Sequence, residues 1–187
     1  MAFSIACFST DEENNIPPSS YTIMKNFINS HIVVGLISQD YVYNEFTYQI
    51  KLGHTAHLKF IYVSNTNEKN KLAQYSDSFL VFINLENQKN CEKIKEIKEF
   101  INNTGNCDKT AYFLGVFKEK DKNAFGKDEV NKILDDSNFP YNYIEIDENN
   151  LNKALEGLFI TVYESLQAGA KGDKYDGDKS RSKCVII

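Results

Sequence analysis

Residues 78–85 read S-F-L-V-F-I-N-L, an apolar run that lacks the alternation of a strand with one face in water. A continuous run of this kind is typical of a strand in a parallel sheet that helices cover on both faces. We therefore expect residues 78–85 to form a central strand. The segments on either side of it decide the fold class.

Segments of strand character alternate with segments of helical character on both sides of this run. The strand-like segments are short, apolar and often aromatic, and lie at residues 3–8, 110–117 and 141–146. Apolar residues recur with a period of about 3.6 in the helical segments, at residues 20–29, 88–102, 127–136 and 151–166. This alternation favours right-handed crossovers and parallel strands.

A hairpin is predicted between the first helical segment and the central strand. Residues 43–52 and 57–63 are extended runs that flank G-H-T-A, and Gly53 supplies the turn. The hairpin adds a strand that runs against the others. We therefore expect an α/β fold, with a six-stranded, mostly parallel sheet, one antiparallel strand and helices on both faces.

The composition is that of a globular domain without a nucleic-acid-binding surface. The chain has 187 residues, 42% hydrophobic and 25% charged, with a net charge of -5 at pH 7. This balance lacks the Lys and Arg excess that neutralises nucleic-acid phosphates. The four cysteines have no disulfide-like spacing, which favours a reducing, cytoplasmic setting. No His or Cys spacing predicts a metal site, and no catalytic set is evident.

The last residues have the character of a lipid-bearing tether. We divide the chain into a domain over residues 1–167 and a tail over 168–187, which is glycine-rich, charged and poor in large aliphatic side chains. The tail ends in C-V-I-I, a C-a-a-X signal that predicts prenylation of Cys184. One isoprenoid holds a protein on a membrane only marginally, so a second signal is needed. Nearby basic residues would supply it on an anionic leaflet, namely Lys179, Arg181 and Lys183.

The predicted sheet, the hairpin after the first helix, the long last helix and the C-a-a-X tail together resemble the Ras superfamily of small GTPases. The stretch N-E-F-T-Y-Q-I-K-L-G at residues 44–53 is similar to the Rab-type second strand, and residues 75–87 to the fourth strand and its exit. Y-F-L-G-V-F-K-E at residues 112–119 is similar to the fifth strand, and residues 151–159 to the start of the last helix. The resemblance covers nearly the whole chain and implies a P-loop NTPase-like small-GTPase fold.

The loops that carry the family's nucleotide chemistry differ at almost every position. In place of G-x-x-x-x-G-K-[ST], residues 9–22 read S-T-D-E-E-N-N-I-P-P-S-S-Y-T, with Ser19 or Ser20 in the approximate slot of the lysine. The acidic residues of this stretch would repel a triphosphate. D-T-A-G-Q becomes V-S-N-T-N at residues 63–67, and S-A-K becomes D-E-N at 147–149. N-K-x-D becomes V-F-K-E, in which only Glu119 is chemically similar.

These losses predict a pseudo-GTPase that carries out no GTP hydrolysis and needs no cofactor. We expect a prenylated protein, peripheral on the cytosolic face of a membrane, that recruits effector-like or regulatory partners in signalling or vesicle traffic. By the resemblance, partners would contact the surface of Tyr41, Tyr43 and Phe46. Alternating aromatics on a strand also serve ordinary packing, which is the competing interpretation of these three residues.

Two alternatives stay open. In the first, the chain is a divergent small GTPase that binds GTP or GDP with Mg²⁺ and acts as a switch. Ser19, Ser20 and Thr22, together with Glu119, would then be what is left of the nucleotide site, since a helix N-terminus offers N–H groups to an anion. The competing interpretation of Ser19 or Ser20 is a helix N-cap. The second alternative is an unrelated flavodoxin-like enzyme.

Overall fold

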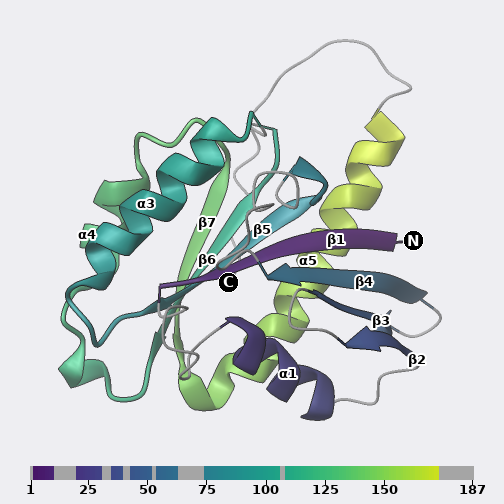
Figure 1. Ribbon diagram of the computed structural model, residues 1–187, viewed down its shortest axis with the longest axis horizontal. Coiled ribbons are helices and arrows are strands. Elements are labelled where there is room, and N and C mark those ends of the chain that lie inside the picture. Colours follow the sequence, from purple (N-terminus) through teal and green to yellow (C-terminus); the bar gives the residue numbers. More distant parts are fainter. Residues whose placement is uncertain are drawn as a thin grey trace.

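Strands β1 to β7 of the described chain form one sheet in the order β2-β3-β4-β1-β5-β6-β7 in the computed structural model (Figure 1). The structure describes residues 2–10, 20–30, 35–39, 43–51, 54–62, 74–105 and 108–172. The strands are β1 (Ala2–Ser9), β2 (Gly35–Gln39), β3 (Tyr43–Lys51), β4 (His54–Tyr62), β5 (Ser78–Asn84), β6 (Ala111–Phe117) and β7 (Tyr141–Asp147). The α-helices are α1 (Ser20–Ser30), α3 (Asn90–Asn103), α4 (Lys127–Leu134) and α5 (Leu151–Gly172), with short 3₁₀ helices η2 (Lys120–Lys122) and η3 (Glu148–Asn150).

The strand directions confirm an α/β fold built on a parallel sheet. β1 pairs in parallel with β4 on one side and β5 on the other, and β6 and β7 continue the parallel arrangement. β3 runs antiparallel to both of its neighbours, β2 and β4. The pairing of β3 with β4 is the predicted hairpin, although His54 to Ala56 belong to β4 and not to the turn.

The predicted count of six strands is wrong, because the described residues contain a further strand, β2. Its five residues, G-L-I-S-Q, are too short for a periodic signal, and they pair only with β3, across an irregular register between Leu36 and Ser38. A short strand of this kind is specified by its neighbour more than by its own sequence.

Helix α5 continues to Gly172, past residue 167, where we place the boundary between the domain and the tail, and that boundary stays a prediction. Ala168, Ala170 and Lys171 are good helix formers, so the helix extends beyond its last large apolar residue. The apolar pattern predicted the helix only as far as Leu166, its last large apolar residue.

β5 is covered on both faces, as its apolar sequence predicts. Every residue of β5 from Ser78 to Ile83 is buried. Leu80 and Phe82 belong to a cluster with helices α1 and α5, whereas Phe79, Val81 and Ile83 belong to a cluster with α3 and α4. Side chains at alternate positions of a strand point to opposite faces, so this one strand takes part in two cores.

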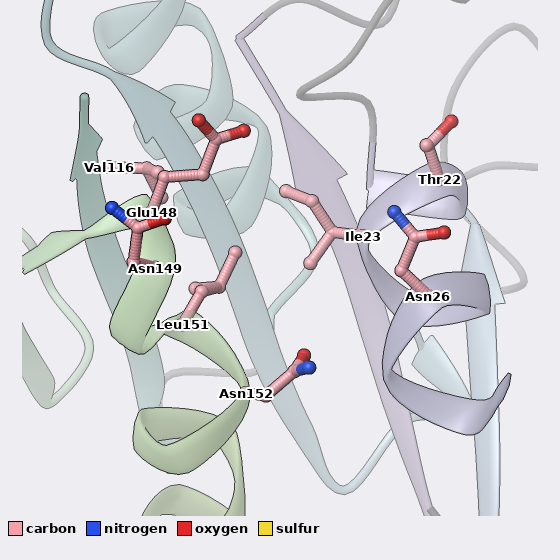
Figure 2. Close-up of a pocket in the computed structure, with 8 residues that line it drawn as sticks. All are labelled: Thr22, Ile23, Asn26, Val116, Glu148, Asn149, Leu151 and Asn152. Carbon is pink, nitrogen blue, oxygen red and sulfur yellow. The ribbon is translucent and has the colours of Figure 1, made fainter. Parts of the chain in front are cut away.

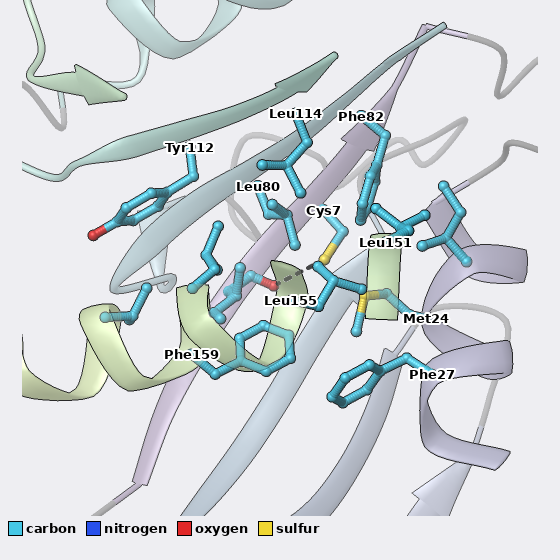
Figure 3. Close-up of a cluster of buried hydrophobic side chains, with 14 of the residues drawn as sticks. Cys7, Met24, Phe27, Leu80, Phe82, Tyr112, Leu114, Leu151, Leu155 and Phe159 are labelled. Atoms are coloured by element: carbon cyan, nitrogen blue, oxygen red, sulfur yellow. Dashed lines mark hydrogen bonds between the residues drawn. The ribbon is translucent and has the colours of Figure 1, made fainter. Parts of the chain in front are cut away.

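The core beneath α1 and α5 is built on aromatic and aliphatic contacts (Figure 3). Phe27 of α1 meets Phe159 of α5 edge to face, with ring centroids 5.2 Å apart and an interplanar angle of 81°. Met24 and Leu155 are fully buried in the same cluster. The two helices are thereby fixed side by side over the sheet. The N-terminal ends of both lie near the carboxyl ends of the parallel strands.

A buried lysine joins α3 to α4 on the opposite face. The Nζ atom of Lys98 donates to Oδ1 of Asp136 at 2.5 Å and to the carbonyl oxygen of Ile133 at 3.0 Å. Lys98 is 9% exposed, whereas the Asp136 side chain is 79% exposed. The lysine stem is packed in the protein while its ammonium group reaches the end of α4, where carbonyl groups lack helical partners.

Gly115 in β6 is required by a side chain of the neighbouring strand. A Cβ atom at this position would lie 2.6 Å from Oη of Tyr143 and 3.0 Å from Cδ1 of Leu85. Tyr143 is buried, and burial, with the nearby Glu145 carboxylate, raises the pKa of its hydroxyl above the ordinary value. The tyrosine ring therefore occupies the space that a larger residue at position 115 would need.

Gly115→Ala is expected to destabilise the fold by about 1–3 kcal/mol, the range for overpacking a core. Removing the hydroxyl with Tyr143→Phe in the same chain should recover part of that loss, because the closest contact involves Oη. Urea denaturation of the two single variants and the double variant measures this coupling. Strictly additive losses would show that the two residues do not compete for space.

Acid stability should depend on Asp136. Lys98 lowers the pKa of Asp136, first through the hydrogen bond and then through its charge. A carboxylate whose folded pKa is depressed stabilises the protein above its unfolded pKa, near about 4, and this contribution is lost as pH falls through the folded pKa. Asp136→Asn should flatten the loss of stability between about pH 5 and pH 2, measured by urea midpoints. Asp128→Asn, on the exposed face of α4, is the control and should keep the wild-type slope.

Candidate functional site

The carboxyl ends of β1 and β5 are where a doubly wound sheet offers its binding crevice. The two strands are neighbours, and the helices that follow them, α1 and α3, cover opposite faces of the sheet. Ligands of open α/β sheets bind outside the carboxyl ends of the strands at such a switch point. Residues 11–19, which contain most of the acidic stretch, lie outside the described residues.

Hydrogen bonds within the protein join the ends of β1 and β5. The backbone N–H of Thr10 donates to the carbonyl of Phe82 at 3.0 Å, and the N–H of Asn84 donates to the Thr10 hydroxyl at 3.2 Å. Thr10 is 6% exposed. Asn90, at the start of α3, donates its side-chain amide to the Asn84 carbonyl at 2.9 Å. The described polar groups of Thr10, Asn84 and Asn90 at this edge are thus hydrogen-bonded within the protein.

Glu86 links the exit of β5 to the exit of β6. Its Oε1 atom accepts hydrogen bonds from the N–H groups of Lys118 at 3.1 Å and Glu119 at 3.3 Å. The Nζ atom of Lys118 lies 3.8 Å from Oε2 of Glu148, in the exit of β7. Three consecutive exit segments are therefore connected along the carboxyl edge, and the backbone after β6 is held by a carboxylate.

A small pocket opens beside these segments, between α1, the end of β6 and the start of α5 (Figure 2). Its volume is about 170 Å³. Ile23, Val116 and Leu151 supply apolar side chains, of which Ile23 and Leu151 point toward each other from the two helices (Figure 2). The rest of its lining is polar and consists of Thr22, Asn26, Glu148, Asn149 and Asn152. Pockets for drug-sized ligands are larger, roughly 300–1,000 Å³.

The predicted nucleotide-site residues are divided by the structure. Thr22 lines the pocket, and Ser20 is the first residue of α1. Glu119 is not among the residues that line the pocket. Its side chain is 64% exposed, and its carboxylate accepts a hydrogen bond from Lys122 at 2.8 Å. Ser19 lies outside the described residues. The structure thus does not bring Thr22 and Glu119 into one site.

The partner and tail residues are mostly beyond what the structure describes. Tyr41 lies outside the described residues, as do the tail residues Cys184, Lys179, Arg181 and Lys183. Tyr43 and Phe46 are in β3, where they pair with Ile61 and Leu58 of β4. The placement of their side chains lies outside what the structure describes.

Several site residues escaped sequence reasoning. Glu86 has no local signature as a backbone acceptor, because both of its donors are more than 30 residues away. Asn26 and Asn152 come from helices that only the tertiary fold brings together. Glu148 could have been predicted from the sequence. By the resemblance, D-E-N at residues 147–149 replaces S-A-K and so places an acidic residue beside the position of the guanine base.

Neither a metal centre nor a membrane span is present in the described part of the chain. No group of three or more His, Cys, Asp or Glu residues within it could hold a metal ion. None of its described helices combines the length and apolar character needed to cross a bilayer. No protein-family model matches the chain, and no curated protein matches it. What the protein does is therefore inferred from its own residues.

Glu86→Ala is expected to loosen the segment after β6. The substitution removes the carboxylate that accepts hydrogen bonds from two backbone N–H groups. Its loss should lower the free energy of unfolding by about 1 kcal/mol. Hydrogen exchange at the amides of Lys118 and Glu119 should become faster, since both donate to this carboxylate. Glu92→Ala, which removes an exposed partner of Lys95, is the matched control and should leave these amides unchanged. Equal exchange in both variants would show that Glu86 does not hold the segment.

Proposed function

We propose that this protein is a membrane-tethered recruitment protein with a small-GTPase-like scaffold that has lost the nucleotide cycle. It belongs, in this proposal, on the cytosolic face of a membrane, where it gathers effector-like or regulatory proteins. The parallel sheet, the hairpin after the first helix and the long last helix are consistent with the Ras-like resemblance. The extra strand β2 is a departure at one edge of the sheet.

The character of the pocket beside β6 is the observation that carries the proposal. By the resemblance, the exit of β6 is where a guanine base would be recognised, and this chain has Val116 and Phe117 at the positions of the N-K pair. Val116 contributes hydrocarbon to the pocket, while Glu148 adds a carboxylate to its rim. The volume, about 170 Å³, is small for a nucleotide. A guanine base at this place would lack the hydrogen bonds of the Asn side chain that Val116 replaces.

The hydrogen-bonded ends of β1 and β5 support the same proposal. A phosphate-binding loop presents N–H groups that are satisfied by the ligand. Here the N–H of Thr10 is satisfied by Phe82, and the N–H of Asn84 by the Thr10 hydroxyl. These two described N–H groups are therefore engaged within the protein, which supports a scaffold that does not depend on a nucleotide.

The membrane tether is proposed from the sequence alone. Prenylation of Cys184 would supply one weak anchor, and Lys179, Arg181 and Lys183 a second, electrostatic one. Attachment would be reversible and would weaken as salt screens the basic residues. A reversible tether suits a protein that gathers partners at a surface without being integral to it.

Titration with fluorescent GTP and GDP, with and without Mg²⁺, tests the loss of the nucleotide cycle. The protein is first freed of carried-over nucleotide by mild unfolding and refolding. We expect no saturable binding at micromolar nucleotide and no rise in thermal stability at millimolar GTP, because a ligand in roughly 100-fold excess over its Kd would add about 2.7 kcal/mol. Submicromolar, Mg²⁺-dependent affinity for GTP would instead establish the alternative, a divergent switch.

A further inference from the structure

Tyr75 is a large hydrophobic side chain left in water by the described fold, with 78% of its surface exposed. It lies in the segment 74–77, directly before β5, at the end of the sheet where the parallel strands begin. We call this end the amino-terminal edge, and it is opposite the carboxyl edge that holds the pocket. Tyrosine has an apolar ring and a polar tip, which suits the boundary between an apolar phase and water.

The backbone that carries Tyr75 is held from two sides. The Ser4 hydroxyl donates to the Tyr75 carbonyl at 2.8 Å, and Nζ of Lys109 donates to the Gln74 carbonyl at 2.7 Å. The N–H of Ser4 donates to Asp77 at 2.7 Å, and the N–H of Asp77 returns a bond to the Ser4 carbonyl at 2.8 Å. The exposed ring therefore stands on a fixed base, which lowers the entropy lost when it binds.

Helix α5 delivers the tail to this same edge. It starts at the carboxyl edge after η3 and runs back along the sheet for 22 residues, or about 33 Å. The strand β5 has seven residues and spans only about 23 Å, so the end of α5 reaches the amino-terminal edge. In Figure 1 the yellow end of α5 and the start of β1 lie toward the same side of the molecule.

The sequence between Gly172 and Cys184 is short enough to keep this edge near the lipid. A chain of twelve residue steps spans at most about 40 Å. A lipid on Cys184 would thus hold the amino-terminal edge within reach of the membrane surface at high effective concentration. The carboxyl edge is farther from the end of α5, by about the length of the sheet.

We propose that the amino-terminal edge docks on the lipid bilayer, with the Tyr75 ring at the level of the headgroups. This inference rests on the proposed tether at Cys184. Among the residues that the structure describes near Tyr75, Lys109 carries a positive charge and Asp108 and Asp77 carry negative charges, and the Asp77 carboxylate accepts a hydrogen bond from the Ser4 N–H. These charges do not by themselves favour anionic lipid, so the tyrosine supplies the contact and the tail supplies the attraction. Docking leaves the carboxyl edge facing the cytosol.

The absence of tryptophan from the chain allows a direct test. Tyr75→Trp places a single fluorophore on the edge, and Gln88→Trp places one on the carboxyl edge as the matched control. Both are made in the full-length, prenylated protein and mixed with vesicles of phosphatidylcholine and phosphatidylserine. Brominated phosphatidylcholine quenches a tryptophan that enters the headgroup region. We expect a blue shift and quenching for Trp at position 75 and neither for Trp at position 88.

The outcomes separate this inference from the proposed function. If the prenylated protein does not bind vesicles at all, the tether and the docking are both wrong. If it binds while the probe at position 75 is unquenched, the tether stands and the docking is wrong, including the case in which only a partner protein shields this probe. Tyr75→Ser should lower the vesicle affinity by roughly threefold or more, and Gln88→Ser should leave it unchanged.

Discussion

The burial of β5 on both faces is the constraint on which the rest of the structure depends. A strand with apolar side chains at consecutive positions, as at residues 79–83, cannot face water on either side, so helices must cover both faces. α1 and α5 cover one face and α3 and α4 the other. Because the chain leaves β1 and β5 toward opposite faces, the carboxyl ends of these two strands become the switch point of the sheet.

The described ends of β1 and β5 are joined at the carboxyl edge by hydrogen bonds within the protein. Thr10 and Asn84 pair with each other, and Glu86 holds the segment after β6. The pocket that is left has an apolar side at Val116 and an acidic rim at Glu148. In the proposed function, this edge would present a surface to partners in one conformation, whereas a switch would need loops that respond to phosphate.

The sequence predicted the elements whose signals are local and periodic. The apolar run of β5, the hairpin of β3 and β4 and the stripe of α5 were each recognisable alone, and the structure has all three. β2 was missed because five residues at a sheet edge take their conformation from β3. The site was predicted only in part. Thr22 lines the pocket, but Glu86 acts on amides far along the chain, and no sequence pattern records such a contact.

The central claim is that the folded protein exists and works without a bound nucleotide. The most direct measurement is the nucleotide content of the full-length protein purified under native conditions with Mg²⁺ present, by chromatography of the denatured extract. The account predicts no guanine nucleotide above a trace, in a protein that is monodisperse and cooperatively folded. A nucleotide present at one equivalent per chain would contradict it.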